Sequence, residues 1–275
     1  MSSDERASPS GHEFYDRTYG SFADKLNATI RSEAFGEEIG QNSWLTADEH
    51  RGFIASLGVD AASEVLEVAC GSGGPALFMA NETGCRVTGV DLHEAGVVAA
   101  NAAAAKQGLS DRVRFVRGDA RDPLPFDDES FDALLCIDSI NHMYERSRAL
   151  ADWLRVLRSG GKLLFTDPIT VTGMIRREEM AVRSGSMGEF VFTAPGVDEA
   201  LLEAAGFEEI RVEDVTSNMA AVAAAWRQAR ARHEADLDQV EGAGANARFQ
   251  EFLGAVERLA SEGRLSRFAY LARKP

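Results

Sequence analysis

Residues 65–76 read VLEVACGSGGPA, and this stretch decides the fold. A short apolar run leads into a glycine-rich turn, and the helix-forming residues 76–80, ALFMA, follow at once. This order is typical of a strand, a tight loop and the first turn of a helix. Glycines at such a turn let the chain bend sharply and let a ligand approach the backbone closely. The segment therefore predicts a ligand-binding loop at the end of a strand.

A second apolar run, residues 86–90, ends at Asp91, 20 positions after Gly71. An acid at this distance can accept hydrogen bonds from the two hydroxyls of a ribose. The loop and Asp91 together predict a site for a cofactor that contains a nucleoside. The glycine spacing alone leaves the cofactor open, because Ala76 also completes the G-x-G-x-x-G/A pattern of nicotinamide and flavin sites. A nicotinamide-dependent oxidoreductase is therefore one alternative.

Three further motifs narrow the choice. Glu67 stands before the loop, where dinucleotide-binding enzymes usually have an apolar residue. The motif GDA at 118–120 follows a third apolar run, and FDALLCID at 131–138 follows LPF at 124–126. With the loop, the segment 64–167 resembles the class I S-adenosylmethionine-dependent methyltransferases, in particular small-molecule enzymes of the phosphoethanolamine and sugar type. The resemblance implies an enzyme that uses S-adenosylmethionine and releases S-adenosylhomocysteine. A non-catalytic cofactor-binding protein of the same fold is a further alternative.

The resemblance also implies how the strand ends would hold the cofactor. Gly71 and Gly73 would pass beneath its methionine part, and Asp91 would bind the ribose hydroxyls, a geometry that a carboxylate satisfies well. Leu92 would pack on the adenine ring, and Asp119 would accept a hydrogen bond from the adenine amino group. The cofactor-binding residues predicted in this part of the chain are Glu67, Ala69, Gly71, Gly73, Asp91, Leu92, Asp119, Ala120 and Ile137.

The N-terminal segment resembles the same enzymes. In them, polar residues before a helix meet the methionine end of the cofactor, and upstream tyrosines close the site. The matching residues here are Gln41, Asn42, Tyr15 and Tyr19. Aromatic residues at three- and four-residue spacing, followed by a loop with two glycines, predict a helical lid that orders when the cofactor binds. Simple packing of an N-terminal helix is the alternative.

Asp138 and His142 are the predicted catalytic residues. They follow the fourth predicted strand, whose end faces the donor methyl group in this fold, and their acid-x-x-x-His spacing resembles several small-molecule methyltransferases. A histidine titrates near neutral pH and can remove a proton from the acceptor. A neighbouring carboxylate would stabilise the imidazolium that forms. The alternative is that His142 only lines the site, because positioning alone can accelerate a displacement.

Predicted strands and helices alternate through the middle of the chain, which implies a mostly parallel sheet with helices on both faces. Ligands in such sheets bind at the carboxyl ends of the strands, where the motifs above lie. The resemblance implies a Rossmann-like α/β fold whose seven-stranded sheet closes with an antiparallel strand. The predicted strands are 64–70, 86–91, 113–117, 131–138, 161–167, 207–214 and 267–272, and the predicted helices are 75–82, 94–107, 147–157 and 197–205.

The chain divides into a polar tail, a cap and one large domain. Residues 1–11 predict a disordered tail, 12–57 an N-terminal helical cap, and 58–275 the methyltransferase domain. Within that domain, 168–262 predicts a substrate-side region with a helical insertion, in which a glycine-containing stretch at 242–244 separates two helices. Thr46 followed by Glu49 predicts a capping box at the start of a helix.

Composition limits the partners. The net charge of −15, without a clustered basic patch, argues against a nucleic-acid substrate and leaves a small-molecule acceptor. No apolar run is long enough to cross a membrane, and the first residues lack a secretory signal, so we expect a cytoplasmic protein, monomeric or homodimeric. The three isolated cysteines fit reduced thiols, and no histidine has a partner at metal-ligand spacing, so we expect no metal.

Overall fold

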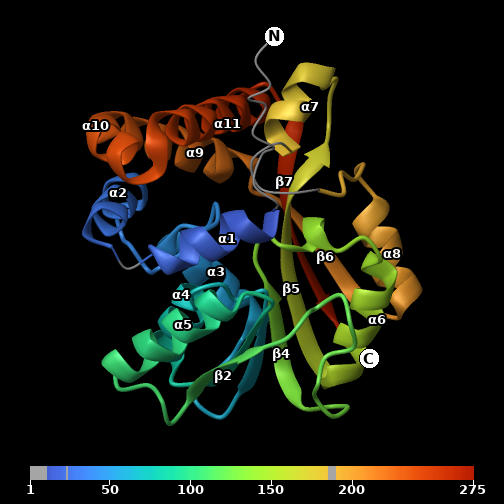
Figure 1. The fold of residues 1–275 in the computed structure, drawn as a ribbon. Helices are drawn as coiled ribbons and strands as arrows, with labels where there is room; N and C mark the ends of the chain where they lie inside the picture. The colour runs from blue at the N-terminus through green and yellow to red at the C-terminus, as the bar shows by residue number, and fades with distance from the viewer. Residues whose placement is uncertain (1–10, 23, 185–189) are drawn as a thin grey trace.

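The structure is a computed structural model that describes residues 11–22, 24–184 and 190–275 (Figure 1). A seven-stranded sheet in the order β3-β2-β1-β4-β5-β7-β6 forms its centre, and β7 alone runs against its neighbours. This confirms the predicted fold. The strands are β1 Glu64–Val68, β2 Arg86–Asp91, β3 Val113–Arg117, β4 Phe131–Cys136, β5 Leu157–Val171, β6 Glu208–Asp214 and β7 Leu265–Arg273.

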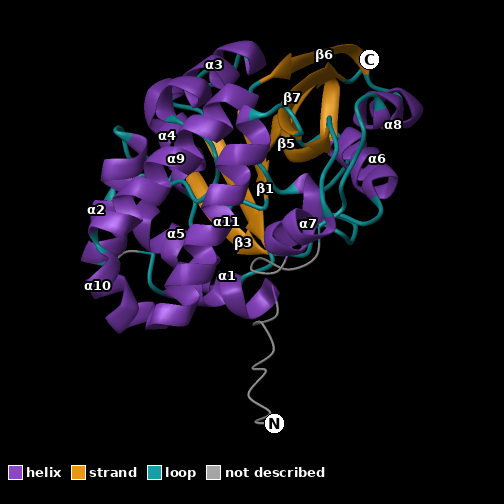
Figure 2. Cartoon of the chain, turned by 90° about the horizontal axis from the view of Figure 1, so that it is seen from above, coloured by secondary structure: helices purple, strands orange, loops and turns teal. Residues whose placement is uncertain are grey.

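Helices cover both faces of the sheet, as Figure 2 shows from above. One apolar core joins the strands to α3, α4 and α5, and a second joins them to α6 and α8. The predicted helices in this part of the chain are confirmed to within one or two residues at each end. Their bounds are α3 Ala47–Leu57, α4 Gly74–Thr83, α5 Glu94–Lys106, α6 Arg146–Val156 and α8 Val197–Ala205.

A third apolar core joins segments from opposite ends of the chain. Ile30 and Phe35 of α2 pack with Trp226 of α9 and Phe252 of α11, and Trp44 completes the contact. These helices form a layer beside one end of the sheet, while α1 runs across the same end (Figure 1). The elements are α1 Gly11–Gly20, α2 Lys25–Phe35, α7 Arg177–Ser184, α9 Thr216–Arg232, α10 Glu234–Leu237 and α11 Ala243–Ser261.

The helices of the predicted cap and of the predicted insertion differ in packing and in bounds from the sequence-based expectation. Within 12–57, α3 belongs to the core of the sheet, through Phe53 and Leu57, whereas α2 belongs to the third core. The insertion breaks first at His233, and a single π-helical turn, Asp238–Gly242, then precedes α11. The predicted disordered tail lies outside the described residues, apart from Gly11. No helix in the described part of the chain has the length and apolar character required to span a membrane.

Candidate functional site

The loop between β1 and α4 requires its glycines. Gly71 and Gly73 have positive φ angles of 54° and 79°, a region that favours glycine. A Cβ atom added to Gly73 would lie 2.5 Å from the ring of Phe115, so this position also lacks room for a side chain. Ala69 has a φ of 56°, which explains why glycine is the easier residue at this position. The predicted ligand loop is therefore held in one tight conformation.

Two buried polar atoms beside this loop have no partner. Glu67 is 3% exposed, and its Oε2 atom accepts no hydrogen bond, while burial raises the pKa of its carboxyl to about 8. Gln41 is fully buried; its Oε1 accepts from the Ile39 amide, but its Nε2 donates to nothing. Because a Cβ on Gly74 would lie 2.2 Å from the Gly40 carbonyl oxygen, the segment with Gln41 lies directly on the start of α4.

An unpaired acceptor and an unpaired donor in a buried site call for a ligand that supplies both. An α-amino acid does so, because its ammonium donates and its carboxylate accepts. Glu67 and Gln41 therefore fit the methionine part of S-adenosylmethionine, with Glu67 toward the ammonium and Gln41 toward the carboxylate.

Asp91 fixes the loop from the end of β2. Its Oδ2 accepts a hydrogen bond from the Gly71 amide and its Oδ1 one from the His93 amide, each at 2.8 Å. The carboxyl is 5% exposed, and burial raises its pKa. Each carboxylate oxygen can accept a second hydrogen bond, so both remain able to receive a ribose hydroxyl. Leu92 follows directly, and Ile137 is buried after β4, which β1 separates from β2.

Asp119 lies after β3 but has a partner that the sequence did not predict. Arg121 donates to both of its carboxylate oxygens, from Nε at 2.9 Å and from Nη2 at 2.6 Å. These hydrogen bonds lower the pKa of Asp119. Ala120 lies between the two and packs against the core beneath β4. Asp119 therefore lies near Asp91, since β3 pairs with β2, and Arg121 binds the carboxylate oxygens that the prediction assigned to the adenine amino group.

Helix α1 brings the predicted tyrosines onto the loop. A Cβ on Gly71 would lie 2.8 Å from the Tyr19 hydroxyl, so this hydroxyl sits directly over the glycine. Asn42 hydrogen-bonds to Tyr19, and Tyr15 stacks on Tyr19 with ring centroids 6.0 Å apart. Burial raises the pKa of both phenols, that of Tyr15 to about 12. These three predicted residues of the N-terminal segment, together with Gln41, thus gather around the loop.

His142 meets Tyr15 from the other side. Its Nε2 atom forms a 3.1 Å hydrogen bond with the Tyr15 hydroxyl, and the two rings meet edge to face. Its ring also lies 4.9 Å from that of Phe190. The two bonded residues are 127 positions apart in the sequence, and no local pattern links them. The structure thereby places His142 against Tyr15 of α1, whose stacking partner Tyr19 lies over Gly71 of the loop.

The predicted pairing of Asp138 with His142 is corrected by the structure. The Asp138 carboxylate accepts hydrogen bonds from Arg267 Nε and Thr166 Oγ1, both at 2.7 Å, and from the Trp44 amide at 2.9 Å. The prediction assumed that the chain turns helical after β4. Instead Asp138 has a φ of +51°, and a single 3-10 turn, Ile140–His142, follows. The two side chains therefore point to different neighbours.

Arg267 and Glu49 are functional-site neighbours that sequence reasoning missed. Arg267 is fully buried, and its Nη1 donates to both oxygens of Glu49 at 2.7 and 2.8 Å. Burial raises the pKa of Glu49. Thr46 caps α3 as predicted by accepting from the Glu49 amide, but the Glu49 side chain turns to Arg267 instead of completing the capping box. In the sequence, the signal for this ion pair was a charged residue, Arg267, near the start of an otherwise apolar strand.

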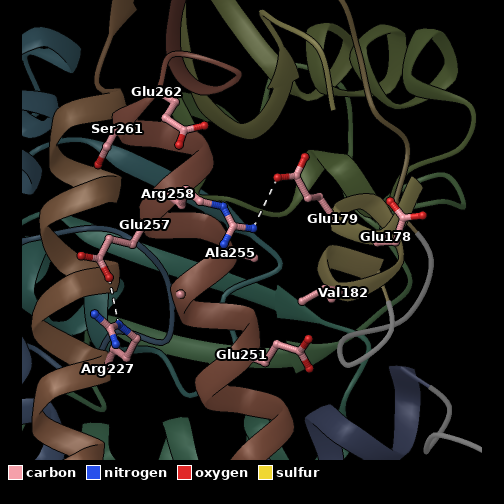
Figure 3. A pocket seen from close by; sticks show the side chains of 11 residues that line it. Glu178, Glu179, Val182, Arg227, Glu251, Ala255, Glu257, Arg258, Ser261 and Glu262 are labelled. Atoms are coloured by element: carbon pink, nitrogen blue, oxygen red, sulfur yellow. Dashed lines mark hydrogen bonds and ion pairs between the residues drawn. The ribbon is translucent and has the colours of Figure 1, made fainter. Parts of the chain in front are cut away.

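A separate hollow opens between α7 and the helices α9 and α11 (Figure 3). Two ion pairs cross its lining, Arg258 with Glu179 and Arg227 with Glu257. None of the predicted site residues lines this hollow. Among the residues that the structure describes, no group of three or more His, Cys, Asp or Glu side chains is arranged to hold a metal ion.

Comparisons with known proteins agree with this geometry. A family described as a methyltransferase domain matches residues 66–165. The chain is 31% identical over 268 residues to the 27-O-demethylrifamycin SV methyltransferase of Amycolatopsis mediterranei, which covers 94% of this chain and 95% of that protein. The crystal structure of the [4+2]-cyclase SpnF aligns over 98% of both chains, with a TM-score of 0.75 and 25% identity. Phosphoethanolamine N-methyltransferase 2 of Haemonchus contortus aligns over 97% of this chain and 60% of that one, with a TM-score of 0.81; its 21% identity shows a shared fold.

Proposed function

Because the chain belongs to the class I S-adenosylmethionine-dependent methyltransferases, we propose that it methylates an oxygen of a small-molecule acceptor. It is an enzyme, and S-adenosylmethionine is its cofactor. The observation that carries the proposal is the hydrogen bond between His142 and Tyr15 beside the cofactor loop. A hydroxyl must lose its proton as its oxygen gains the methyl group, so a histidine there suits an oxygen acceptor. Nitrogen is the alternative.

In this proposal different residues bind the cofactor, accept the proton and exclude water. S-adenosylmethionine supplies a methyl group on a positively charged sulfur. Glu67, Gln41 and Asp91 would hold its amino acid and ribose parts, so that the acceptor approaches in line with the breaking bond. His142 would take the acceptor proton at Nε2, the atom that the Tyr15 hydroxyl occupies in this structure, so the acceptor hydroxyl would first replace that of Tyr15 there. Helix α1 would exclude water from the site.

The relative from Amycolatopsis mediterranei supports an oxygen acceptor, because its name describes the methylation of a 27-O-demethyl compound. The nicotinamide-dependent oxidoreductase considered from the glycine spacing finds no support in the comparisons. The likeness to a structure titled as a [4+2]-cyclase means that the fold by itself does not identify the reaction.

The proposal is tested by an acceptor screen with two readouts. Paired phenols, alcohols and amines of matched size are incubated with S-adenosylmethionine, and both S-adenosylhomocysteine and the methylated product are measured. We expect methylated product from a hydroxyl compound, and no product when the matched methyl ether replaces it. Product from amines only would move the proposal to nitrogen. Cofactor binding without any methylated product would favour the non-catalytic alternative.

We further propose that α1 is a lid that orders on cofactor binding. Tyr15 and Tyr19 cover the loop, so movement of α1 away from it would expose the loop to an entering cofactor. Saturating S-adenosylhomocysteine should slow amide hydrogen exchange across residues 11–20 and leave exchange in α6 unchanged. Identical exchange in α1 with and without the ligand would exclude a lid.

Replacing Asp91 with alanine should weaken S-adenosylhomocysteine binding about tenfold to a hundredfold, since losing a buried hydrogen-bonding partner costs about 1–3 kcal/mol. The loss includes the support that Asp91 gives to the Gly71 amide. Calorimetric titration checks the affinity, with Asp122→Ala as the control because Asp122 follows the neighbouring strand and is exposed. Wild-type affinity in Asp91→Ala would contradict the assignment.

Cofactor affinity should rise with pH because of Glu67. Its pKa of about 8 leaves the carboxyl protonated at neutral pH, while the cofactor ammonium favours the ionised form. Binding therefore releases a proton, and affinity should increase by up to about tenfold per pH unit between pH 6 and 8 and then level off. Glu67→Gln should remove this slope, and Glu64→Gln on the same strand should keep it. A flat wild-type profile in calorimetry would contradict the role.

A further inference from the structure

Arg183, near the end of α7, is a buried cation that forms no ion pair with any residue that the structure describes. It is 2% exposed, and neither its Nε nor its Nη1 atom has a hydrogen-bond partner. Its guanidinium lies 4.7 Å from the centre of the Phe190 ring and 4.9 Å from that of Phe252. Burial lowers its pKa to about 10. Among the residues that the structure describes, its close contacts are with aromatic faces, while Asp138 and Asp167 act on it only through their negative charge, which raises its pKa.

The other buried arginines of the described chain show how unusual this is. Four of them form ion pairs with carboxylates: Arg31 with Glu38, Arg146 with Asp167 and Asp198, Arg230 with Glu241, and Arg267 with Asp138 and Glu49. Burying a charge without an ion pair is unfavourable, and the two cation–π contacts offset only part of that cost. The remaining cost favours a ligand that completes the environment of Arg183.

The position of Arg183 indicates which ligand it faces. The Phe190 ring that it contacts also contacts His142, with centroids 4.9 Å apart. The positive charge of Arg183 also lowers the pKa of Tyr15, against the larger effect of burial. Arg183 therefore faces the pair that we assign to the acceptor, whereas the cofactor assignments lie on the loop side of Tyr15.

We propose that Arg183 binds a planar oxyanion on the acceptor, a carboxylate or an ionised enol attached to a flat conjugated ring. A guanidinium offers two pairs of parallel N–H donors that match such a group, Nε with Nη2 and Nη1 with Nη2, and the unpartnered Nε and Nη1 each belong to one of these pairs. Phe190 is only partly buried, so its face can contact the flat apolar body of the acceptor. The proposal rests on the proposed function, whose acceptor site it describes.

The test uses 1-naphthoate and its neutral isostere 1-naphthamide as probes. Each is titrated calorimetrically into the full-length enzyme saturated with S-adenosylhomocysteine. We expect the wild-type protein to bind the acid at least tenfold more tightly than the amide. Arg183→Met should abolish this preference, and Arg183→Lys should retain part of it because the charge remains and the fork is lost. The control is Arg177→Met, an exposed arginine of the same helix, which should bind like the wild type.

Two results would overturn the proposal in the binding experiment: equal affinity of the wild-type protein for both probes, or binding of neither at millimolar concentration. Thermal unfolding supplies a second readout. Removing an uncompensated buried charge should leave the melting temperature of Arg183→Met equal to or above that of the wild type. A large fall together with loss of S-adenosylhomocysteine binding would show that Arg183 serves the fold.

The proposal and the proposed function fail in different ways. Methylation of neutral acceptors without any preference for naphthoate would overturn the anion site and leave the methyltransferase assignment intact. Binding of naphthoate through Arg183, with no methyl transfer to any acceptor, would support the anion site and overturn the proposed function.

Discussion

An Arg267→Met variant should lose about 3–5 kcal/mol of its free energy of unfolding, because Asp138 and Glu49 would stay buried without their counterion. Arg267 donates to both carboxylates and is itself fully buried. Its ion pairs join β7, the end of β4 and α3, which are distant in sequence. The substitution should therefore disturb the site as well as the fold.

Urea denaturation with a tryptophan fluorescence readout measures this loss. Arg273→Met is the matched control, since Arg273 lies on the same strand but forms its ion pairs at the surface with Glu208 and Glu209. Such surface pairs contribute about 0–1 kcal/mol. Adding Glu49→Gln to Arg267→Met should restore part of the stability, because one of the two carboxylates left without a counterion is removed. A loss below about 1 kcal/mol in the single variant would contradict a structural role of the ion-pair cluster.

Replacing His142 with alanine should lower turnover by about 10²–10⁴-fold, the usual range for loss of a general base. Its Nε2 atom is hydrogen-bonded to Tyr15, while the loop contacts that we assign to the cofactor involve other residues. Affinity for S-adenosylhomocysteine should therefore stay within about twofold of the wild type. The acidic limb of the pH–rate profile should disappear, since that limb reports protonation of the base.

Tyr15→Phe separates the role of the ring from that of the hydrogen bond. It keeps the aromatic contact with His142 and removes the hydroxyl, so turnover should fall less than in His142→Ala. His233→Ala is the control, because His233 pairs with Glu33 between α9 and α2, away from the loop. Wild-type turnover of His142→Ala on the true acceptor would leave positioning alone as the better account of catalysis.

The regular part of the fold could be predicted because its determinants are local. The apolar runs that end at Glu67 and Asp91 set the strands, and the glycines between them set the loop. In a parallel sheet the carboxyl ends of neighbouring strands meet at one edge, so Asp91, Asp119 and Ile137 could be placed together without coordinates. The N-terminal tyrosines could be predicted only through the resemblance to a family.

The sequence by itself determined the sheet and the loop, because periodicity and turn residues act over a few positions. The cofactor class followed from the resemblance of its motifs to a family. The tertiary structure alone decided which side chains became partners. In the folded chain Asp138 hydrogen-bonds to Arg267 and His142 to Tyr15, and α2 packs against α9 and α11. The fold also buried the Nε and Nη1 atoms of Arg183 without a hydrogen-bond partner among the described residues. Such pairings depend on where distant segments meet in space, and the four-residue spacing of Asp138 and His142 carried no information about that.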